Sequence, residues 1–366
     1  MTLRIAHLQP IVPHYREEFF ALIGGRTEQD IYVYSDDRAA RRDGFSVAQV
    51  RHKHIHTLRF LHDNVLIYNP FTLLRGHDVL VLMLHAGHVT TWLLLLTKWL
   101  HRRKIILWGQ GISIRRYHKE ERRPNLLRRW MISLADGCWI YVPKQAEQWR
   151  AIFPRKPIVA LYNTVSNARA MAYYEVRAEK ERLRKKYGIR QHRVMIICTR
   201  FESKRRRTDI LEMVMRALDP EAHAFIIIGG GSLKPDFSVY ANAYDFGSIY
   251  DNAIKRELFA VADIYFQPGW IGLSVVEAMA YALPVFTFVR DLPRGIGHGV
   301  EYDYINNGVT GRLFTDISEC VACIRDSSDV EIKTMGDNAR RFVRETLMPE
   351  QMAERAYSII EQVQRK

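Results

Sequence analysis

Basic side chains cluster directly after a short apolar run near the middle of the chain. The run Val194–Thr199 has the composition of a buried strand, Arg200 follows it at once, and Lys204 and Arg205 come shortly afterwards. Cations at the carboxyl end of a strand and the start of a helix suit a diphosphate, whose anionic oxygens accept their hydrogen bonds. We therefore predict a phosphate-binding site here, and we interpret the two arginines after Arg205 as solvated surface charges.

A single carboxylate stands in an otherwise apolar passage further along the chain. The passage Pro268–Phe286 has the pattern of a loop, a helix and a strand, and Glu277 is its one acidic residue. Burying a carboxylate without partners is costly, so Glu277 is expected to have hydrogen-bond donors. The hydroxyl groups of a ribose would supply such donors, and a structural salt bridge is the alternative.

A turn without side chains follows the apolar run Ala224–Ile228. Gly229, Gly230 and Gly231 allow the backbone to approach a ligand closely, although the conformation of the turn explains such a triplet equally well. The triplet is neither a dinucleotide-binding fingerprint nor a P-loop, because no Lys-Ser or Lys-Thr pair follows at the required spacing.

The elements that position these residues alternate between short apolar runs and longer helical patterns, which predicts parallel sheets covered by helices. A chain of 366 residues is too long for one ordinary core, so we expect two domains. We predict a first domain over 1–168, a connection over 169–190, a second domain over 191–345 and a C-terminal helix over 346–366. The other predicted strands are Leu3–Leu8, Val79–Leu84, Ile105–Trp108, Trp139–Val142, Ile264–Gln267 and Val285–Phe288.

Ligands of open α/β sheets bind at the carboxyl ends of the strands, which directs attention to two loops of the first domain. A proline-containing loop after the first strand carries His14, Tyr15 and Arg16. His85 and His88 follow the strand Val79–Leu84, where a role in substrate binding and ordinary packing are both open.

The passage Pro268–Phe286 resembles the donor-binding signature of the family 4 retaining glycosyltransferases, in which a loop, Gly-Leu and Glu-Ala-Met-Ala precede a Pro-Val strand. The resemblance is specific over the C-terminal half of the chain, whereas the N-terminal half matches mainly in layout. It also covers Arg200 with Lys204 or Arg205, the glycine turn, Phe246–Asn252 and Asn307–Phe314, and more weakly Trp108–Gly111 and Asn163–Thr164.

This resemblance implies a GT-B fold, in which two Rossmann-like domains face each other across a cleft and the C-terminal helix packs back on the first domain. The implied reaction transfers a sugar with retention from a nucleotide-diphosphate sugar, with UDP-sugar favoured over GDP-sugar and with neither a metal nor another cofactor. The implied catalytic residues are Arg200, Lys204, Glu277 and His85.

The resemblance also assigns positions around the donor and the acceptor. Arg200 with Lys204 or Arg205 would meet the diphosphate, and Glu277 would bind the ribose. The remaining donor-side positions are Gly230 in the turn, Ile249 near the base, and Gly272, Leu273 and Ser274, which offer backbone amides. The acceptor-side positions are His14, Tyr15, Arg16, His85, His88 and Gln110.

Two positions depart from the pattern of the family. Counting back from Glu277 places Gly269 where the first carboxylate of an acidic pair belongs, and that carboxylate normally touches the donor sugar. Gln110 stands where relatives often have a histidine, but the leaving phosphate can itself take the acceptor proton. Glu301, in the loop after the last predicted strand, is a hypothetical replacement for the missing carboxylate.

The formal net charge of +14 implies an anionic partner, which can be nucleic acid, phospholipid or a phosphorylated substrate. Ten cations and two carboxylates lie between Arg102 and Arg129. The apolar side chains of Leu126, Leu127, Trp130 and Met131 favour contact of this basic segment with an anionic membrane surface, and a solvated face is the alternative.

We therefore expect an acceptor that is a lipid-linked or membrane-proximal glycan, as in the biosynthesis of surface polysaccharides. The first residues show neither a signal peptide nor an anchor, so we expect a cytoplasmic protein that is peripheral on the inner face of the plasma membrane. The longest apolar run, Val89–Leu100, is shorter than the roughly 20 residues that span a bilayer, and we interpret it as a buried core helix.

Two other functions remain open. A nucleotide-sugar epimerase or hydrolase of the same fold would need acidic or basic groups for proton transfer, and few carboxylates are expected in the cleft. A non-enzymatic polyanion-binding protein would use the basic face, but no nucleic-acid-binding motif is present, and we expect no nucleic-acid partner.

Overall fold

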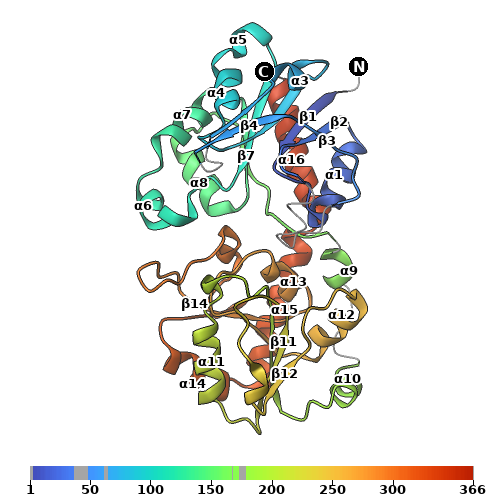
Figure 1. Cartoon of the computed structure of the whole chain (residues 1–366), viewed down its shortest axis with the longest axis vertical. Coiled ribbons are helices and arrows are strands. Elements are labelled where there is room, and N and C mark those ends of the chain that lie inside the picture. The colour runs from blue at the N-terminus through green and yellow to red at the C-terminus, as the bar shows by residue number, and fades with distance from the viewer. Residues whose placement is uncertain (1–2, 37–47, 62–64, 167, 173–178, 366) are drawn as a thin grey trace. The chain divides into compact units, whose positions relative to one another are not determined.

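The computed structural model describes residues 3–36, 48–61, 65–166, 168–172 and 179–365 (Figure 1). The chain forms two compact units, one of which combines Met1–Asn167 with Pro349–Lys366, while the other comprises Ala168–Met348. We call them unit 1 and unit 2. Residues 173–178, which belong to the predicted connection, lie outside the described residues.

Unit 1 is built on a seven-stranded parallel sheet with the order β3-β2-β1-β6-β7-β8-β9. The order reverses between β1 and β6, and such a reversal leaves a crevice at the carboxyl ends of the two strands. A separate antiparallel hairpin joins β4 (Thr57–Phe60) and β5 (Val65–Tyr68). The strands of the sheet are β1 (Arg4–Gln9), β2 (Glu28–Val33), β3 (Lys53–His54), β6 (Val79–Met83), β7 (Lys104–Gly109), β8 (Gly137–Ile140) and β9 (Ile158–Ala160).

Helices cover both faces of this sheet and bury two apolar layers. Side chains of α1 and α16 pack on one face, and side chains of α4, α7 and α8 pack on the other. The helices of unit 1 are α1 (Glu17–Gly24), α3 (Pro70–Leu74), α4 (Val89–Leu96), α5 (Lys98–His101), α6 (Tyr117–Arg122), α7 (Leu126–Leu134), α8 (Pro143–Ile152) and α16 (Pro349–Gln364), with single turns at η1 (His14–Arg16) and η2 (Ile114–Arg116).

Unit 2 contains a six-stranded parallel sheet with the order β12-β11-β10-β13-β14-β15, which reverses between β10 and β13. Its strands are β10 (Arg193–Cys198), β11 (His223–Ile228), β12 (Ala243–Asp245), β13 (Ile264–Phe266), β14 (Val285–Phe288) and β15 (Gly311–Phe314). Its helices are α9 (Ala168–Ala172), α10 (Lys180–Lys186), α11 (Thr208–Ala217), α12 (Asn252–Val261), α13 (Ser274–Ala280), α14 (Ile317–Asp326) and α15 (Asp329–Thr346), with single turns at η3 (Lys204–Arg206), η4 (Phe237–Val239) and η5 (Val300–Tyr304).

The two predicted Rossmann-like sheets are confirmed. Every strand predicted from an apolar run is present, with each end within two residues of the prediction. The sequence missed five strands of the two sheets because they are short or, like β2, begin with polar residues; these are β2, β3, β9, β12 and β15.

The prediction of one buried core helix over Val89–Leu100 is wrong. The segment breaks at Thr97 into α4 and α5, and only one side of it enters the core, where Leu94 and Leu95 are buried. Trp99 is 77% exposed and Leu100 68% exposed. Apolar residues lie on more than one side of this segment, so its pattern could not reveal which side is exposed.

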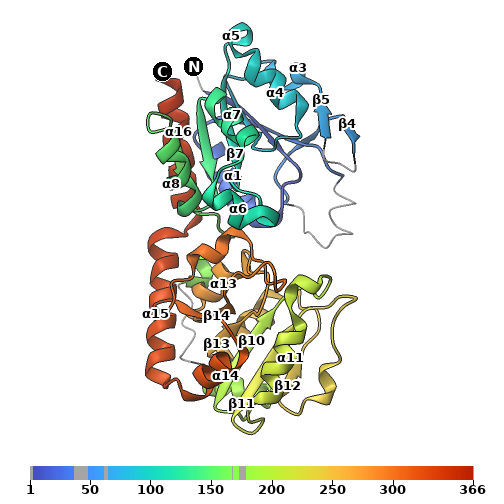
Figure 2. The same ribbon diagram turned by 90° about the vertical axis from the view of Figure 1, so that its left-hand side faces the viewer.

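The predicted packing of the C-terminal helix on the first domain is confirmed. Helix α16 contacts α1, β8 and β9 of unit 1, as Figure 2 shows. Its apolar face includes Met352, Ala356, Ile360 and Val363, all of which are buried. Arg26, in the turn after α1, forms an ion pair with the exposed carboxylate of Glu354 beside this interface.

Truncation of the buried α16 face should destabilise unit 1. We expect Ile360→Ala, at a fully buried position, to lower the free energy of unfolding of unit 1 by about 2–5 kcal/mol. Gln362→Ala, at an exposed position on the same helix, should change it by less than about 0.5 kcal/mol. Denaturant titration measures both values, and equal effects of the two substitutions would contradict the packing of this helix.

Candidate functional site

The predicted phosphate-binding cations lie where the strand order of unit 2 reverses. Two loops meet there, one after β10 and the other after β13. Arg206 joins them, because its Nη1 donates to the carbonyl of Trp270 at 3.0 Å and its Nε donates to the carbonyl of Arg200 at 3.2 Å. The guanidinium of Arg205 stacks on the ring of Trp270, with 4.7 Å between Cζ and the ring centre.

The interpretation of Arg206 and Arg207 as solvated charges is wrong. Arg206 is half-buried, and its pKa is lowered mainly by burial and further by the charge of Arg200. Arg207 forms an ion pair with Asp209 and donates to the carbonyl of Arg294 at 2.9 Å. Both guanidinium groups donate hydrogen bonds to backbone or carboxylate oxygens, so they connect the loops rather than face the solvent.

The three cations predicted to bind phosphate remain exposed. Arg200, Lys204 and Arg205 are exposed on the stretch that Arg206 and Arg207 anchor. A rigid backbone that presents exposed cations at the carboxyl edge of a parallel sheet has the properties of an anion-binding site.

The glycine turn after β11 packs against the backbone of residues 199–201, which lead into the stretch that carries the exposed cations. Phe201 N–H donates to the carbonyl of Gly230 at 2.9 Å. A Cβ at Gly229 would lie 1.8 Å from the carbonyl oxygen of Thr199, and a Cβ at Gly231 would lie 2.5 Å from that of Phe201. The conformational explanation therefore holds for the two outer glycines, since the backbone of 199–201 occupies the space of their side chains.

Glu277 on α13 is paired with a cation that the sequence did not reveal. Nζ of Lys255 on α12 lies 2.7 Å from each carboxylate oxygen of Glu277, whose side chain is only 13% exposed. Burial has the largest single effect and lowers the pKa of Lys255, but the charge of Glu277, the hydrogen bond to it and the nearby Cys198 together raise this pKa above its usual value. The salt bridge named as the alternative is therefore present. It leaves acceptor capacity on the carboxylate, which has about four lone-pair directions.

A buried tyrosine and a cysteine lie beside the Lys255–Glu277 pair. The hydroxyl of Tyr265 donates to the carbonyl of Cys198 at 3.2 Å. Burial raises the pKa of the Cys198 thiol to about 11, although nearby Lys255 opposes that shift. The thiol is consequently protonated at neutral pH and is not a nucleophile.

His298 fixes the loop that precedes α13, and sequence reasoning missed it. Its ring is fully buried, Nδ1 accepts from Ile271 N–H at 3.1 Å, and Nε2 donates to the carbonyl of Phe288 at 2.9 Å. Burial, with a smaller effect of the charge of Arg290, lowers the pKa of His298 to about 3. The imidazole is therefore neutral and held in one tautomer.

The same loop explains the departure at Gly269. A Cβ there would stand 2.4 Å from the carbonyl oxygen of Arg205 and 2.8 Å from Cγ of Arg207. A carboxylate side chain at this position would displace the stretch that carries the exposed cations. At Gly272, by contrast, a Cβ would meet no heavy atom within 4 Å, so this face of the loop is open.

Glu301 on η5 lies against the open loop. Glu301 is 7% exposed. Gly299 lies between Glu301 and the loop: a Cβ added to Gly299 would be 2.8 Å from Oε2 of Glu301 and 3.6 Å from Cα of Gly272. The buried carboxylate of Glu301 is thus close to the loop in which Gly269, the position of the family's first carboxylate, has no space for a side chain. Three further donor-side candidates are half-buried, namely Ile249 after β12, Leu273 and Ser274.

In unit 1, the loop after β1 carries a buried arginine in an aromatic box. Nη2 of Arg16 donates to the hydroxyl of Tyr141 at 3.0 Å and to Oδ1 of Asn163 at 3.3 Å. Its guanidinium carbon lies 4.2 Å from the centre of the Trp108 ring. Arg16 is 4% exposed, and within the described part of the chain its Nη1 has no hydrogen-bond partner. A buried cation without a carboxylate is unusual for a purely structural residue.

The other acceptor-side candidates lie on the same edge of the unit 1 sheet. The rings of His85 and His88, after β6, are 4.8 Å apart. Burial and then the charge of His85 lower the pKa of His88 to about 3, while burial and then Arg128 lower the pKa of His85. Both imidazoles are therefore neutral at pH 7. Gln110 after β7 and Tyr15 are half-buried, and His14 is exposed.

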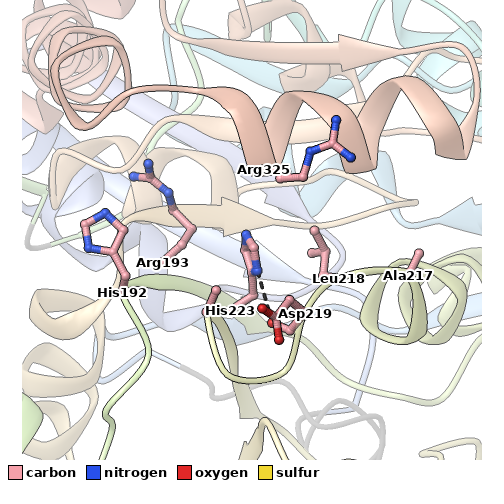
Figure 3. Close-up of a pocket in the computed structure, with 8 residues that line it drawn as sticks. His192, Arg193, Ala217, Leu218, Asp219, His223 and Arg325 are labelled. Carbon is pink, nitrogen blue, oxygen red and sulfur yellow. Dashed lines mark hydrogen bonds between the residues drawn. The ribbon is translucent and has the colours of Figure 1, made fainter.

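A separate pocket lies at the opposite, amino-terminal edge of the unit 2 sheet (Figure 3). It has a volume of about 300 Å³. Its cations are already neutralised, since Arg193 pairs with Asp329 and Arg325 with Asp326. Nδ1 of His223 donates to the backbone carbonyl of Asp219 at 3.1 Å. The charges of both arginines in this pocket are therefore already balanced by carboxylates.

Two properties of the described residues bear on cofactors and membranes. No group of three or more histidine, cysteine, aspartate or glutamate side chains among them is placed to hold a metal ion. None of the helices they form is long and apolar enough to cross a bilayer.

No protein-family model matches the chain, and no curated protein sequence matches it. Solved structures do match. HepE from Anabaena, in complex with UDP, has a TM-score of 0.65 at 13% identity over 99% of this chain and 100% of that one. The lipopolysaccharide outer core galactosyltransferase WaaB has a TM-score of 0.63 at 14% identity, over 98% and 99% of the two chains. Sucrose-phosphate synthase from Thermosynechococcus elongatus has a TM-score of 0.62 at 15% identity, over 99% of both.

These full-length likenesses show the fold. The chain has the GT-B fold, with two Rossmann-like units, that the sequence resemblance predicts.

The two loop glycines should respond differently to a methyl group. We expect Gly269→Ala to lower the free energy of unfolding of unit 2 by about 1–3 kcal/mol, because the new Cβ meets the Arg205 backbone. Gly272→Ala is the matched control and should change it by less than about 1 kcal/mol in either direction. Denaturant titration tests both, and a Gly269→Ala protein as stable as Gly272→Ala would show that the loop is not closed at 269.

Stability should depend on pH through His298. Its pKa of about 3 in the folded state lies below the unfolded value of about 6.5, so the unfolded chain binds the proton first. The wild-type protein should therefore lose stability as the pH falls through 6.5 toward 3. Relative to His298→Asn, which keeps an acceptor for Ile271 N–H, it should lose about 2 kcal/mol more between pH 7.5 and pH 5. His118→Asn, at an exposed position, is the control, and parallel pH profiles of all three proteins would contradict this assignment.

Proposed function

We propose that the chain is a family 4 retaining glycosyltransferase that transfers a sugar from a UDP-sugar bound at the carboxyl edge of unit 2. The observation that carries this proposal is the set of exposed cations Arg200, Lys204 and Arg205, held rigid at the reversal of the strand order. The fold supports it, since HepE has the same fold and its structures contain UDP and UDP-glucose.

The donor is proposed to bind with its diphosphate at these cations and its ribose at Glu277. The carboxylate retains acceptor capacity beside Lys255, and Lys255 would act as a positioning residue that holds the carboxylate in place. The base would lie near Ile249, and the loop Gly272–Ser274, which has open space at Gly272, would border the phosphates and the sugar.

The proposed reaction breaks the bond between the anomeric carbon and the diphosphate oxygen and forms a bond from an acceptor hydroxyl to the same face of the sugar. The acceptor proton passes to the leaving phosphate oxygen, so the reaction needs no strong enzymatic base. Arg200 and Lys204 would stabilise the charge that develops on the diphosphate, in the role that a metal ion has in other transferases. Glu301 is proposed to contact the sugar, because it is the buried carboxylate beside the loop.

The acceptor side is proposed to lie on unit 1. Neutral His85 and His88 can accept or donate hydrogen bonds to acceptor hydroxyls, and Gln110 and His14 lie on the same edge. Arg16 is proposed to position the loop that carries His14 and Tyr15, since it ties that loop to Tyr141 and Asn163.

The acceptor is proposed to be a lipid-linked or membrane-proximal glycan of a surface polysaccharide, and the protein to be peripheral on the inner face of the plasma membrane. Two structural neighbours support this class, because WaaB is a lipopolysaccharide outer core galactosyltransferase and WaaG is a glycosyltransferase of lipopolysaccharide biosynthesis. The basic segment Arg102–Arg129 would meet anionic lipid.

Nucleotide binding is the first consequence to test. In a thermal-shift panel of UDP, GDP, ADP and CMP, we expect UDP alone to raise the melting temperature strongly. A ligand at about 100 times its dissociation constant stabilises by about 2.7 kcal/mol. The shift should disappear in Glu277→Ala and in Arg200→Ala. It should persist in the control Glu257→Ala, which removes a carboxylate of α12 that is paired with Lys186. A panel without any shift would contradict the proposal and would favour a polyanion-binding protein.

Membrane association makes a separate prediction. Reversing four exposed charges, Arg115, Arg116, Arg122 and Arg123, to glutamate should abolish cosedimentation with vesicles that contain anionic lipid. Reversing four exposed cations of unit 2, namely Arg182, Lys185, Arg190 and Arg216, changes the net charge equally and should have a much smaller effect. Equal losses in the two variants would indicate a response to net charge alone.

A further inference from the structure

Three neighbouring helices of unit 1 expose large apolar side chains together. Helix α4 contacts both α5 and α7, and the three lie side by side in both views (Figures 1 and 2). We call their exposed side chains the apolar face. Its members are Leu93 (49% exposed), Leu96 (60%), Trp99 (77%), Leu100 (68%), Leu126 (59%), Leu127 (51%) and Trp130 (63%).

The helices that carry the apolar face are firmly packed on their other side. Leu94 and Leu95 of α4 and Met131 and Ile132 of α7 are buried in one core cluster. The expectation that Met131 contacts a membrane surface is wrong, because this side chain is fully buried. The exposure of the remaining side chains is therefore a property of the folded unit, and large apolar side chains exposed together on neighbouring helices mark a site of interaction.

The charge around the apolar face is positive. Between Asp78 and Asp136 the only acidic residues are Glu120 and Glu121. Both are already paired, Glu120 with Arg116 and Arg128, and Glu121 with Lys144.

The cations that border the apolar face are exposed. Arg102 follows α5, Arg122 and Arg123 precede α7, and Arg129 lies on α7. None of these four has an ion pair within the residues that the structure describes. The surface thus combines apolar side chains with unneutralised arginines.

We propose that the apolar face inserts into the boundary between headgroups and acyl chains of an anionic bilayer, while Arg102, Arg122, Arg123 and Arg129 contact lipid phosphates. This inference rests on the proposed membrane association and names the element that enters the lipid. Indole rings favour the interfacial region, where Trp99 and Trp130 would anchor the face. A second copy of the chain is a poorer occupant, because it would bring two arginine-rich rims together.

The test compares apolar and charged contributions. We expect the double variant Trp99→Ser and Trp130→Ser to bind vesicles of mixed phosphatidylcholine and phosphatidylglycerol about tenfold more weakly, or worse, than the wild type. The matched control is the double variant Val239→Ser and Val330→Ser, since these valines of unit 2 are 71% and 72% exposed. Unchanged melting temperatures and UDP-induced shifts would show that both variants are folded.

Each outcome decides the inference. If the tryptophan variant binds vesicles as the wild type does while the fourfold charge reversal abolishes binding, association is electrostatic and the inserted face is wrong. If the tryptophan variant instead loses self-association in lipid-free solution, as measured by light scattering, a second copy covers the face and the inference is overturned. The vesicle assay contains no nucleotide, so a failure of the proposed donor site would leave its result intact.

Discussion

The guanidinium of Arg206 connects the two loops on which the candidate site of unit 2 depends. It donates to the carbonyls of Arg200 and Trp270, and so crosses the point where the strand order reverses between β10 and β13. Exposed cations bind an anion well only if their backbone is already ordered, because ordering it on binding would cost conformational entropy. Half-buried Arg206, with Arg207, orders this stretch, and its close packing leaves no space for a side chain at Gly269.

The rest of the site follows from that constraint. With residue 269 closed, the buried carboxylate beside the open loop at Gly272 comes from Glu301 on η5, which lies far along the chain. His298 holds the same loop through both ring nitrogens, and Lys255 holds Glu277. His298 and Glu277 therefore have defined partners, which is the arrangement expected of a site whose geometry must be fixed before a ligand arrives.

The sequence was sufficient to predict the sheets and the exposed cations, because both are local features. An apolar run such as Val285–Phe288 reveals a buried strand, and Arg200 directly after a strand must lie at the carboxyl edge. Lys255 and His298 were missed because their partners are distant in the chain. A lysine in an amphipathic helix and a histidine between two glycines give no sign in the sequence of which residues they contact. The run Val89–Leu100 was misjudged for a different reason, since apolar residues on both sides of a helix do not show which side the fold buries.

The GT-B fold follows from the full-length structural likeness, and the chemistry proposed here depends on the carboxyl edge of unit 2. The most direct test is a crystal structure of the protein soaked with UDP. The account predicts the diphosphate within hydrogen-bond distance of Arg200 and Lys204, with the ribose hydroxyls at Glu277. Density for UDP at the opposite edge of the sheet, in the pocket lined by Arg193, His223 and Arg325, would contradict it.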